Sequence, residues 1–328
     1  MKRALLLLSA LSALALSSCS LTLWNYSNIT SKRFALVYGV ARYTSSTTDY
    51  PPNLSFPSDD AQSMADMLSA EGYGVTSRWV DHLGNVYVNG VLAVGAFDSS
   101  PQVPNKANIA ADIASLAGQV GPNDVFVFYF SGHGMQDTTQ SPPVEYFVPE
   151  GAVSGAGGSE PLSISDAEFG SMLAPIASKR KVVILDTCNS GGFIGNTLEA
   201  DAIPAASLGS SGSISLQALA QALGSFLSFT TSTPSLSPYG GAMVFSAAGR
   251  DESCYETPTW GHGVMTYFLI QAQQSGDLNH DGHVTVDEAF SLVKAGIETD
   301  WNGNPTVQAA GEQFEPRISG GPIDFVLW

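Results

Sequence analysis

The chain has 328 residues, of which 13% are charged, with a net charge of −17 and a pI near 4.4. This length suffices for one large domain or two small ones, and the apolar fraction of 44% is ordinary for a globular protein. A surface this acidic repels phosphate backbones, so we expect no nucleic-acid partner. The acidity attracts basic partners and divalent cations, or serves only solubility.

The start of the chain has the pattern of an export signal. Lys2 and Arg3 precede an apolar stretch, residues 4–16, that is shorter than the roughly 20 residues of a membrane span. Residues 16–19, Leu-Ser-Ser-Cys, resemble the lipobox of bacterial lipoproteins. The resemblance implies a signal peptide at 1–18, lipidation of Cys19, a tether at 19–31 and an exported protein anchored by lipid in the bacterial cell envelope. Ordinary signal cleavage beside an incidental cysteine is the alternative.

From residue 32 onward, predicted strands alternate with predicted helices. The predicted strands are 34–40, 75–80, 124–130, 181–185, 242–246 and 323–327, and the predicted helices are 57–71, 105–120, 166–177, 263–274 and 286–297. Ser58 is the expected N-cap of the first helix, with Asp59 and Asp60 in its first turn. Asn89-Gly90, between apolar alternations at 85–94, predicts a hairpin.

This alternation predicts one α/β domain at 32–328, a three-layer α/β/α sandwich around a mostly parallel, six-stranded sheet. Residues 193–241 form a long insertion rich in Ser, Ala, Leu and Gly. We expect this insertion to be a mobile flap rather than a second domain.

Two of the predicted strands end in small-residue turns that carry a reactive side chain. His133 lies in Ser-Gly-His-Gly after strand 124–130, and Cys188 lies in Asp-Thr-Cys-Asn-Ser-Gly-Gly after strand 181–185. The carboxyl ends of neighbouring parallel strands meet in one crevice, where a thiol and an imidazole form a nucleophile and its base. This is the chemistry of a cysteine peptidase. His262 is a rival for the base, and an inert thiol beside a structural histidine is the plain alternative.

Five motifs in order resemble the caspase-like cysteine peptidases, most closely the bacterial metacaspase-like branch. They are residues 34–40 with Tyr43, 57–61, 129–134, 186–191 and 244–248. The likeness covers residues 32–328 and implies the caspase-like fold and protein or peptide substrates. Asn189 departs from the histidine that often follows the nucleophile in metacaspases, and we expect activity despite it because this position is not the base.

Each catalytic position has an expected role. Cys188 attacks the peptide carbonyl as a thiolate, and His133 keeps the thiol reactive and protonates the leaving amine. The backbone N–H groups of Gly134 and Cys188 are the expected oxyanion donors.

Substrate preference follows from charge. Asp60 and Asp186 are expected near the nucleophile, where two carboxylates bind a guanidinium or ammonium group. The resemblance implies that they line the pocket for the residue before the scissile bond (P1) and select Arg or Lys, with Ser246 as a further substrate-binding position. The alternatives are a helix-capping carboxylate for Asp60 and a structural hydrogen bond to the loop for Asp186.

No Lys or Arg occurs between Lys181 and Arg250. An enzyme that cuts after basic residues cannot cut its own insertion, so we expect an active single chain. Lys32-Arg33 or residues 179–181 are the available self-cleavage sites.

Two other functions stay open. One is a non-catalytic, calcium-binding, caspase-like lipoprotein that acts as a binding module, and the other is a ligase or transpeptidase that passes the acyl group to an amine.

Residues 277–288 match a calcium loop of EF-hand type. The expected ligands, at loop positions one, three, five, seven, nine and twelve, are Asp277, Asn279, Asp281, the carbonyl of His283, Thr285 and Glu288. Calcium is therefore the expected cofactor, structural or activating. The alternatives are an Asx-rich loop without metal, and zinc on His280 and His283, which lacks enough nitrogen or sulfur ligands nearby.

Cys254 has no clear partner in the sequence. Three cysteines in separate contexts do not make a disulfide scaffold. A free or buried thiol and a regulatory disulfide with Cys188 are the two interpretations.

Overall fold

The computed structural model describes residues 31–43, 53–94, 101–139, 141, 143–151, 162–188, 190, 241–249, 251–319 and 324–328. Residues Arg33–Trp328 make up one unit. The expected signal peptide, Cys19, nearly all of the tether, Asn189 and nearly all of the insertion at 193–241 lie outside the described residues. Within the described part, no helix is long and apolar enough to cross a membrane.

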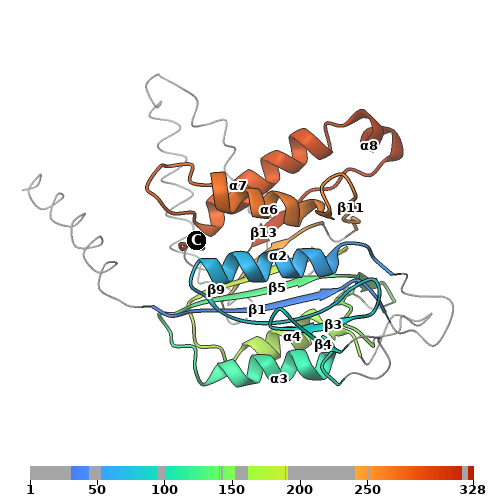
Figure 1. Cartoon of the computed structure of the whole chain (residues 1–328). Coiled ribbons are helices and arrows are strands. Elements are labelled where there is room, and N and C mark those ends of the chain that lie inside the picture. Colours follow the sequence, from blue (N-terminus) through green and yellow to red (C-terminus); the bar gives the residue numbers. More distant parts are fainter. Residues whose placement is uncertain are drawn as a thin grey trace, which may run out of the picture. The chain divides into compact units, whose positions relative to one another are not determined.

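An eight-stranded sheet forms the middle layer, in the order β13-β10-β9-β5-β1-β2-β3-β4 (Figure 1). Its strands are β1 (Arg33–Val40), β2 (Gly74–Val80), β3 (Val86–Val88), β4 (Val91–Val94), β5 (Val125–Ser131), β9 (Arg180–Asp186), β10 (Met243–Ser246) and β13 (Arg317–Ser319). The five strands from β10 to β2 run parallel, and β13, β3 and β4 pair antiparallel at the two edges.

The predicted fold class is confirmed, but the sheet has eight strands rather than six. The hairpin at Asn89-Gly90 adds β3 and β4, with left-handed φ angles of 49° and 77° at these two residues. The strand predicted at 323–327 is wrong: Arg317–Ser319 takes the sheet edge, and Val326 makes only an isolated bridge to Thr285. Residues 325, 327 and 328 pack in the core instead, and this burial gave the segment its strand-like apolar pattern.

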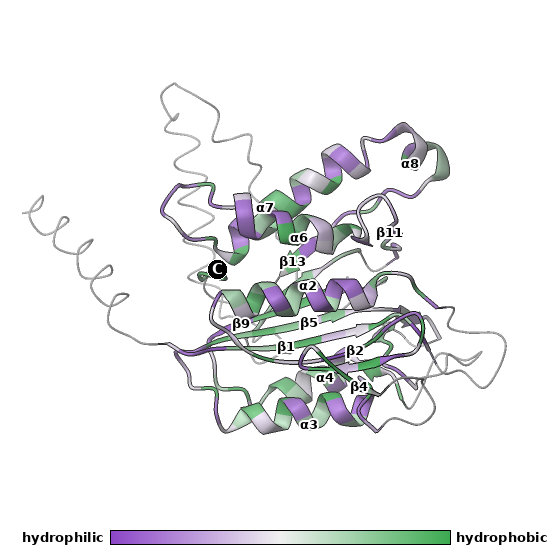
Figure 2. Ribbon diagram, viewed as in Figure 1, coloured by the Kyte–Doolittle hydropathy of each residue, from purple (hydrophilic) through white to green (hydrophobic). Residues whose placement is uncertain are grey.

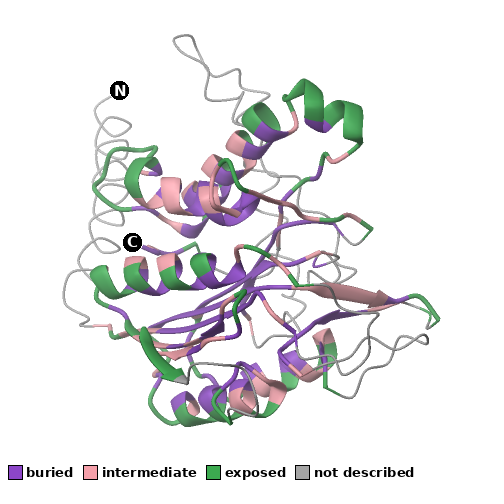
Figure 3. Cartoon of the chain, turned by 45° about the vertical axis from the view of Figure 1, so that its right-hand side comes forward, coloured by how far each residue is buried: buried purple, intermediate pink, exposed green. Residues whose placement is uncertain are grey.

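Helices cover both faces of the sheet (Figure 1). One face carries α2 (Pro57–Ala70), α6 (Val264–Ser275) and α7 (Val286–Gly296), and the other carries α3 (Lys106–Ala117) and α4 (Asp166–Leu173). Figure 2 shows apolar residues along the strands and on the inner sides of the helices. Figure 3 shows the same inner sides buried and the outer sides exposed.

Several short elements have no counterpart in the sequence prediction. They are the three-stranded sheet of β6 (Gly134–Asp137), β7 (Val144–Phe147) and β8 (Ile164–Ser165), the ribbon of β11 (Glu256–Thr257) and β12 (His262–Gly263), the π-helix η3 (Ile297–Trp301) and α8 (Pro305–Ala310). Two to six residues carry too little periodicity to predict an element.

The strand alternation divides the core into two clusters. In β5, Val125, Val127 and Tyr129 face α2, α6 and α7, whereas Phe126, Phe128 and Phe130 face α3 and α4. Successive side chains of a strand point to opposite faces. By the same parity, the last residues of β5 and β9, Ser131 and Asp186, point toward the α2 and α6 face.

Helix α2 begins differently from the prediction. Phe56 is the N-cap without a side-chain hydrogen bond, and Pro57 is the first helical residue. The predicted cap, Ser58, lies inside the helix and is buried. Proline is favoured at this position because its φ is already helical and its missing N–H is not needed there. Asp59 and Asp60 occupy the first turn, as predicted.

Candidate active site

His133 and Cys188 follow the carboxyl ends of neighbouring parallel strands. Ser131 of β5 lies opposite Asp186 of β9, so the two turns begin at the same level of the sheet. One open cleft has both residues in its wall. Its lining residues are Leu54, Pro57, Asp60, Ser131, Gly132, His133, Asp186, Cys188, Cys254, Tyr255, Glu256 and Gly263. Tertiary structure therefore brings together the predicted nucleophile, base and two carboxylates.

The sulfur of Cys188 lies against a second thiol. Its Sγ is 3.6 Å from the Sγ of Cys254 and 3.6 Å from the Cys254 carbonyl oxygen. Neither cysteine is in a disulfide. The hydrogen bond with the Cys254 side chain lowers the pKa of Cys188 to about 7, against the opposing effect of burial. The same pairing and burial raise the pKa of Cys254. The pair is therefore partly ionised near neutral pH, and the Cys254 thiol favours the thiolate form of Cys188.

Tyr43 fixes the backbone at His133. Its buried hydroxyl accepts a hydrogen bond from the His133 N–H at 2.8 Å and donates one to the Val148 carbonyl at 3.2 Å. The tyrosine and histidine rings lie 5.0 Å apart and tilted by 40°. The His133 carbonyl also accepts from the Val148 N–H at 2.9 Å. These bonds hold the histidine turn against the chain that follows β7.

Gly134 packs against the turn of the nucleophile. A Cβ at this position would collide with the backbone carbonyl oxygen of Cys188 and lie 3.1 Å from the Thr187 Cβ. Only a residue without a side chain allows this approach. The histidine and cysteine turns are therefore in direct backbone contact.

Asp60 is a buried carboxylate, and both of its oxygens accept hydrogen bonds from protein groups. Its Oδ1 accepts from His262 Nδ1 at 2.8 Å and from the Gly263 N–H at 3.1 Å, and its Oδ2 accepts from the Ser131 hydroxyl at 2.9 Å. Burial raises its pKa, while the bonds from His262, Ser131 and Gly263 oppose the rise. Burial lowers the pKa of His262, but the hydrogen bond and charge of Asp60 outweigh this and raise it. The structure thus places His262, the rival base, as the partner of Asp60 and not in the cleft wall.

Asp186 is the second buried carboxylate. Its Oδ2 accepts from the Thr266 hydroxyl at 2.6 Å and from the Thr266 N–H at 3.1 Å, at the start of α6. Burial and the nearby charge of Asp60 raise its pKa to about 7. At neutral pH the empty cleft therefore holds a partly protonated Asp186 beside Asp60 and its histidine.

Gly263 lies between the two carboxylates. A Cβ here would be 2.5 Å from Asp186 Oδ2 and 3.1 Å from Asp60 Oδ2. The two acidic groups thus share one wall of the cleft.

Ser246, the further substrate-binding position expected from the sequence, does not line the cleft. It is fully buried, and its hydroxyl bonds to the Ser190 hydroxyl at 2.7 Å and the Ala248 carbonyl at 2.6 Å.

The loop at 277–288 joins α6 to α7, as predicted. Its polar side chains accept loop N–H groups: Asp277 from Asp281 and Gly282, and Asn279 from Asp281. Glu288 forms a capping box with Thr285 at the start of α7. In the described residues, no three His, Cys, Asp or Glu side chains gather as a metal-binding group. The three acidic members of the expected calcium set, Asp277, Asp281 and Glu288, are therefore not gathered as such a group.

Comparison with known proteins assigns the family. The caspase-domain model matches residues 32–312, so the chain belongs to the caspase-domain peptidase family. Membership supports a cysteine-peptidase function in general and implies protein or peptide substrates. No curated protein sequence matches the chain.

One solved structure supports the same fold, and a second is reported for its likeness. A Geobacter sulfurreducens protein of known crystal structure is similar with a TM-score of 0.51 at 15% identity, over 88% of this chain and 92% of that chain. Caspase-1 from Spodoptera frugiperda is similar with a TM-score of 0.48 at 11% identity, over 90% of this chain and 88% of that chain. At this identity, the first likeness shows the fold alone.

Sequence reasoning missed several residues of the site. Gly263 and Glu256 line the cleft, and Thr266 bonds to Asp186. All three come from a segment more than sixty residues after Cys188, and no local signal marks them. Glu256 accepts from the Ser55 and Phe56 N–H groups at 2.8 and 3.0 Å, and so fixes the chain entering α2. Tyr43 was recognised as part of a motif, but its bond to His133 depends on the tertiary fold.

Proposed function

We propose that this chain is a cysteine endopeptidase that hydrolyses peptide bonds after Arg or Lys, with a Cys188/His133 dyad. One observation carries the proposal: a single cleft holds the thiol, the imidazole and two buried carboxylates. Thiol and imidazole supply nucleophile and base, and the carboxylates supply a pocket for a cation.

The reaction follows from the residues of the cleft. The Cys188 thiolate attacks the peptide carbonyl carbon, and His133 gives a proton to the leaving amine. The N–H groups of Gly134 and Cys188 stabilise the oxyanion. Water, deprotonated by His133, then releases the acyl group from the sulfur. A pKa near 7 for Cys188 supports this role because it provides thiolate at neutral pH.

A basic P1 residue of the substrate would give Asp186 a positively charged partner. Asp60 already has His262 as its partner, whereas the bonds described for Asp186 come only from the uncharged Thr266. An entering guanidinium group favours the ionised form of Asp186 and offsets the cost of burying that charge. We therefore assign Asp186 the larger share of the selectivity and Asp60 the smaller one.

The test is an assay of fluorogenic peptides ending in Arg, Lys, Asp, Asn or Leu, with the Cys188→Ala variant as control. We expect cleavage after Arg and Lys that vanishes in the variant. Cleavage only after Asp would refute the acidic pocket but keep the dyad. If no peptide is cleaved and a thiol-reactive peptide fails to label Cys188, the binding-module function takes its place.

An added amine separates hydrolysis from acyl transfer. An endopeptidase gives free carboxylate products in the presence of an amine nucleophile, whereas a ligase or transpeptidase gives an amide product that mass spectrometry detects.

We also propose a calcium site at 277–288 and a lipid anchor at Cys19. The loop motif and its place between two helices support the first. The sequence at 16–19 supports the second and favours the bacterial cell envelope as location. Incorporation of a labelled fatty acid that is lost in Cys19→Ser tests the anchor, and failure of both proteins to take up label refutes it.

A further inference from the structure

The second cysteine of the cleft has a position that the peptidase reaction does not require. Cys254 lies in the loop between β10 and β11, and its sulfur is 3.6 Å from the sulfur of Cys188. Strands β9 and β10, which lead to the two cysteines, pair directly, and the Ala247 N–H bonds to the Leu185 carbonyl at 2.9 Å. The contact between the sulfurs thus rests on the register of adjacent strands.

Both cysteines face the cleft. Each cysteine is only partly buried, and both line the open cleft. A disulfide requires the sulfurs to approach from this contact to about 2.05 Å. The two sulfurs, already in van der Waals contact, must therefore close by about 1.5 Å.

Charge favours joining the two sulfurs. Cys188 is partly ionised near neutral pH, and it lines the same cleft as the buried Asp60 and Asp186. A disulfide is neutral, so its formation removes one negative charge from a wall that already holds two carboxyl groups. Thiolate is also the form that peroxides oxidise.

We propose that Cys188 and Cys254 form a reversible disulfide when a peroxide oxidises the nucleophile, with Cys254 as the resolving cysteine. In the first step the Cys188 thiolate attacks one peroxide oxygen; an S–O bond forms, the O–O bond breaks, and the leaving hydroxide takes a proton to become water. In the second step Cys254, having lost its proton, attacks the Cys188 sulfur; the S–S bond forms, the S–O bond breaks, and a second water leaves.

In total, two thiols and one hydrogen peroxide give one disulfide and two waters. The two sulfurs lose two electrons, which the peroxide gains. A small thiol reverses the reaction by exchange. Cys254 thereby keeps Cys188 from reaching the sulfinic and sulfonic acids, which thiols do not reduce.

Disulfide formation does not depend on peptidase activity, so mass spectrometry tests it directly. The full-length protein is treated with hydrogen peroxide, blocked with a thiol reagent and digested with trypsin. Cys188 and Cys254 then fall in different peptides, 182–250 and 251–294, because Lys181, Arg250 and Lys294 bound them. We expect these two peptides to be linked in the oxidised protein and separate after dithiothreitol.

The variants Cys254→Ser and Cys254→Ala test the protective role. In both, we expect peroxide to drive Cys188 to sulfinic and sulfonic acid, and dithiothreitol to leave it oxidised. Cys19→Ser is the matched control and should behave as the wild type. Two substitutions of Cys254 are used so that the test still stands if one variant misfolds. Far-UV circular dichroism shows whether each variant is folded.

Two results would overturn the proposal. One is overoxidation of Cys188 in the wild type without a 182–250/251–294 linked pair. The other is full recovery of free Cys188 thiol by dithiothreitol in the folded Cys254 variants. If peroxide abolishes peptide cleavage by the wild type and dithiothreitol restores it, the disulfide also controls activity. Only this readout rests on the proposed peptidase function.

Discussion

Burial and pairing set the charges of the cleft residue by residue. Burial, with the charge of Asp60, raises the pKa of Asp186 to about 7, whereas the Cys254 thiol lowers the pKa of Cys188 to the same range. One carboxyl and one thiol thus titrate together near neutral pH. Their effects on activity separate only when substrates of different charge are compared.

The first prediction concerns that separation. The ratio of kcat/KM for a peptide ending in Arg to kcat/KM for one ending in citrulline, its uncharged analogue, should rise as pH increases through about 7. The sign follows because ionised Asp186 attracts only the Arg side chain, while ionisation of Cys188 affects both peptides equally. In Asp186→Asn the ratio should be lower and nearly independent of pH in this range. A ratio that stays flat in the wild type would contradict a role for Asp186 in selectivity.

The second prediction concerns the backbone contact at Gly134. Gly134→Ala should destabilise the fold by about 1–3 kcal/mol, because the new Cβ overlaps the Cys188 carbonyl. Activity should fall strongly, since the nucleophile turn must shift. Urea unfolding and kcat/KM measure the two effects. Gly118→Ala is the matched control, since a Cβ at Gly118 meets nothing within 4 Å. Equal stability of the two variants would contradict the prediction.

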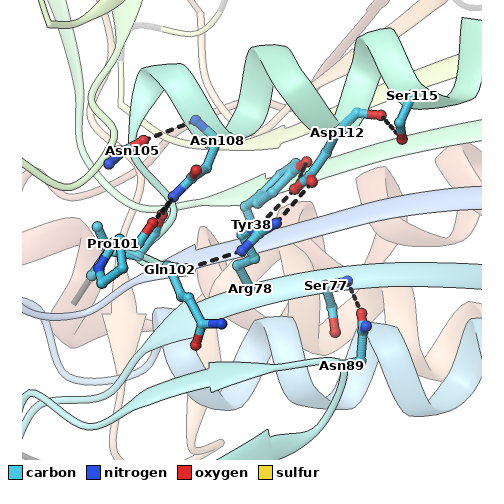
Figure 4. A network of polar contacts seen from close by, with 11 residues as sticks. Tyr38, Ser77, Arg78, Asn89, Pro101, Gln102, Asn105, Asn108, Asp112 and Ser115 are labelled. Atoms are coloured by element: carbon cyan, nitrogen blue, oxygen red, sulfur yellow. Dashed lines mark hydrogen bonds and ion pairs between the residues drawn. The ribbon is translucent and has the colours of Figure 1, made fainter. Parts of the chain in front are cut away.

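At the scale of elements, a partly buried ion pair ties helix α3 to the sheet. Asp112 accepts from Arg78 Nε at 2.7 Å, from Arg78 Nη2 at 2.9 Å and from the Tyr38 hydroxyl at 3.1 Å (Figure 4). One carboxylate thus joins α3, β2 and β1. These bonds lie on the sheet face opposite to Asp60 and Asp186, so they support the scaffold rather than the chemistry.

The third prediction tests this connection. Asp112→Ala should lower the free energy of unfolding by about 2–4 kcal/mol, because the buried Tyr38 hydroxyl and the partly buried Arg78 lose the carboxylate that accepts from them. Glu168→Gln is the control: the more exposed Lys106–Glu168 pair, 2.7 Å apart, should contribute less than about 1 kcal/mol. Chemical denaturation measures both variants. Similar losses in both would contradict the assignment of Asp112 as an anchor.

At the scale of the whole molecule, the loop at 277–288 connects the helix layer to the chain end. Val284 exchanges backbone hydrogen bonds with Leu327 and Trp328, and Val286 donates to the Phe325 carbonyl. From Thr266, which bonds to Asp186, helix α6 continues to Ser275, a length of about 14 Å at 1.5 Å per residue, before the loop begins. Calcium in the loop would therefore act first on stability.

The fourth prediction follows from that position. Calcium should raise the Tm by about 5 °C, and a chelator should reverse the change. Glu288→Gln should abolish the shift because it removes the charge of the twelfth ligand while glutamine still suits the capping box. Magnesium is the control ion. A Tm indifferent to calcium would leave the loop without metal.

The fifth prediction concerns the integrity of the chain. If the enzyme cuts after Arg or Lys, the active protein should remain uncut between Lys181 and Arg250, where no basic residue occurs. Intact-mass measurement of protein incubated until peptide cleavage is established checks this. Fragments that end inside 182–249 would contradict a basic preference.

The layer order of the domain is predictable from the sequence, which also singles out Cys188 and His133 as the candidate nucleophile and base. Long buried strands and amphipathic helices follow from local periodicities in the sequence. They can therefore be predicted without knowledge of tertiary contacts. The turns at His133 and Cys188 were also visible because small residues and a reactive side chain follow each strand directly.

Tertiary structure decided the rest, because those contacts join distant segments. It assigned the last sheet strand to Arg317–Ser319, moved His262 from rival base to partner of Asp60, and buried Ser246 away from the cleft. It also brought Cys254 to Cys188 across sixty-six residues. No local pattern encodes such pairings, since strand register and helix docking fix them only when the whole core has packed.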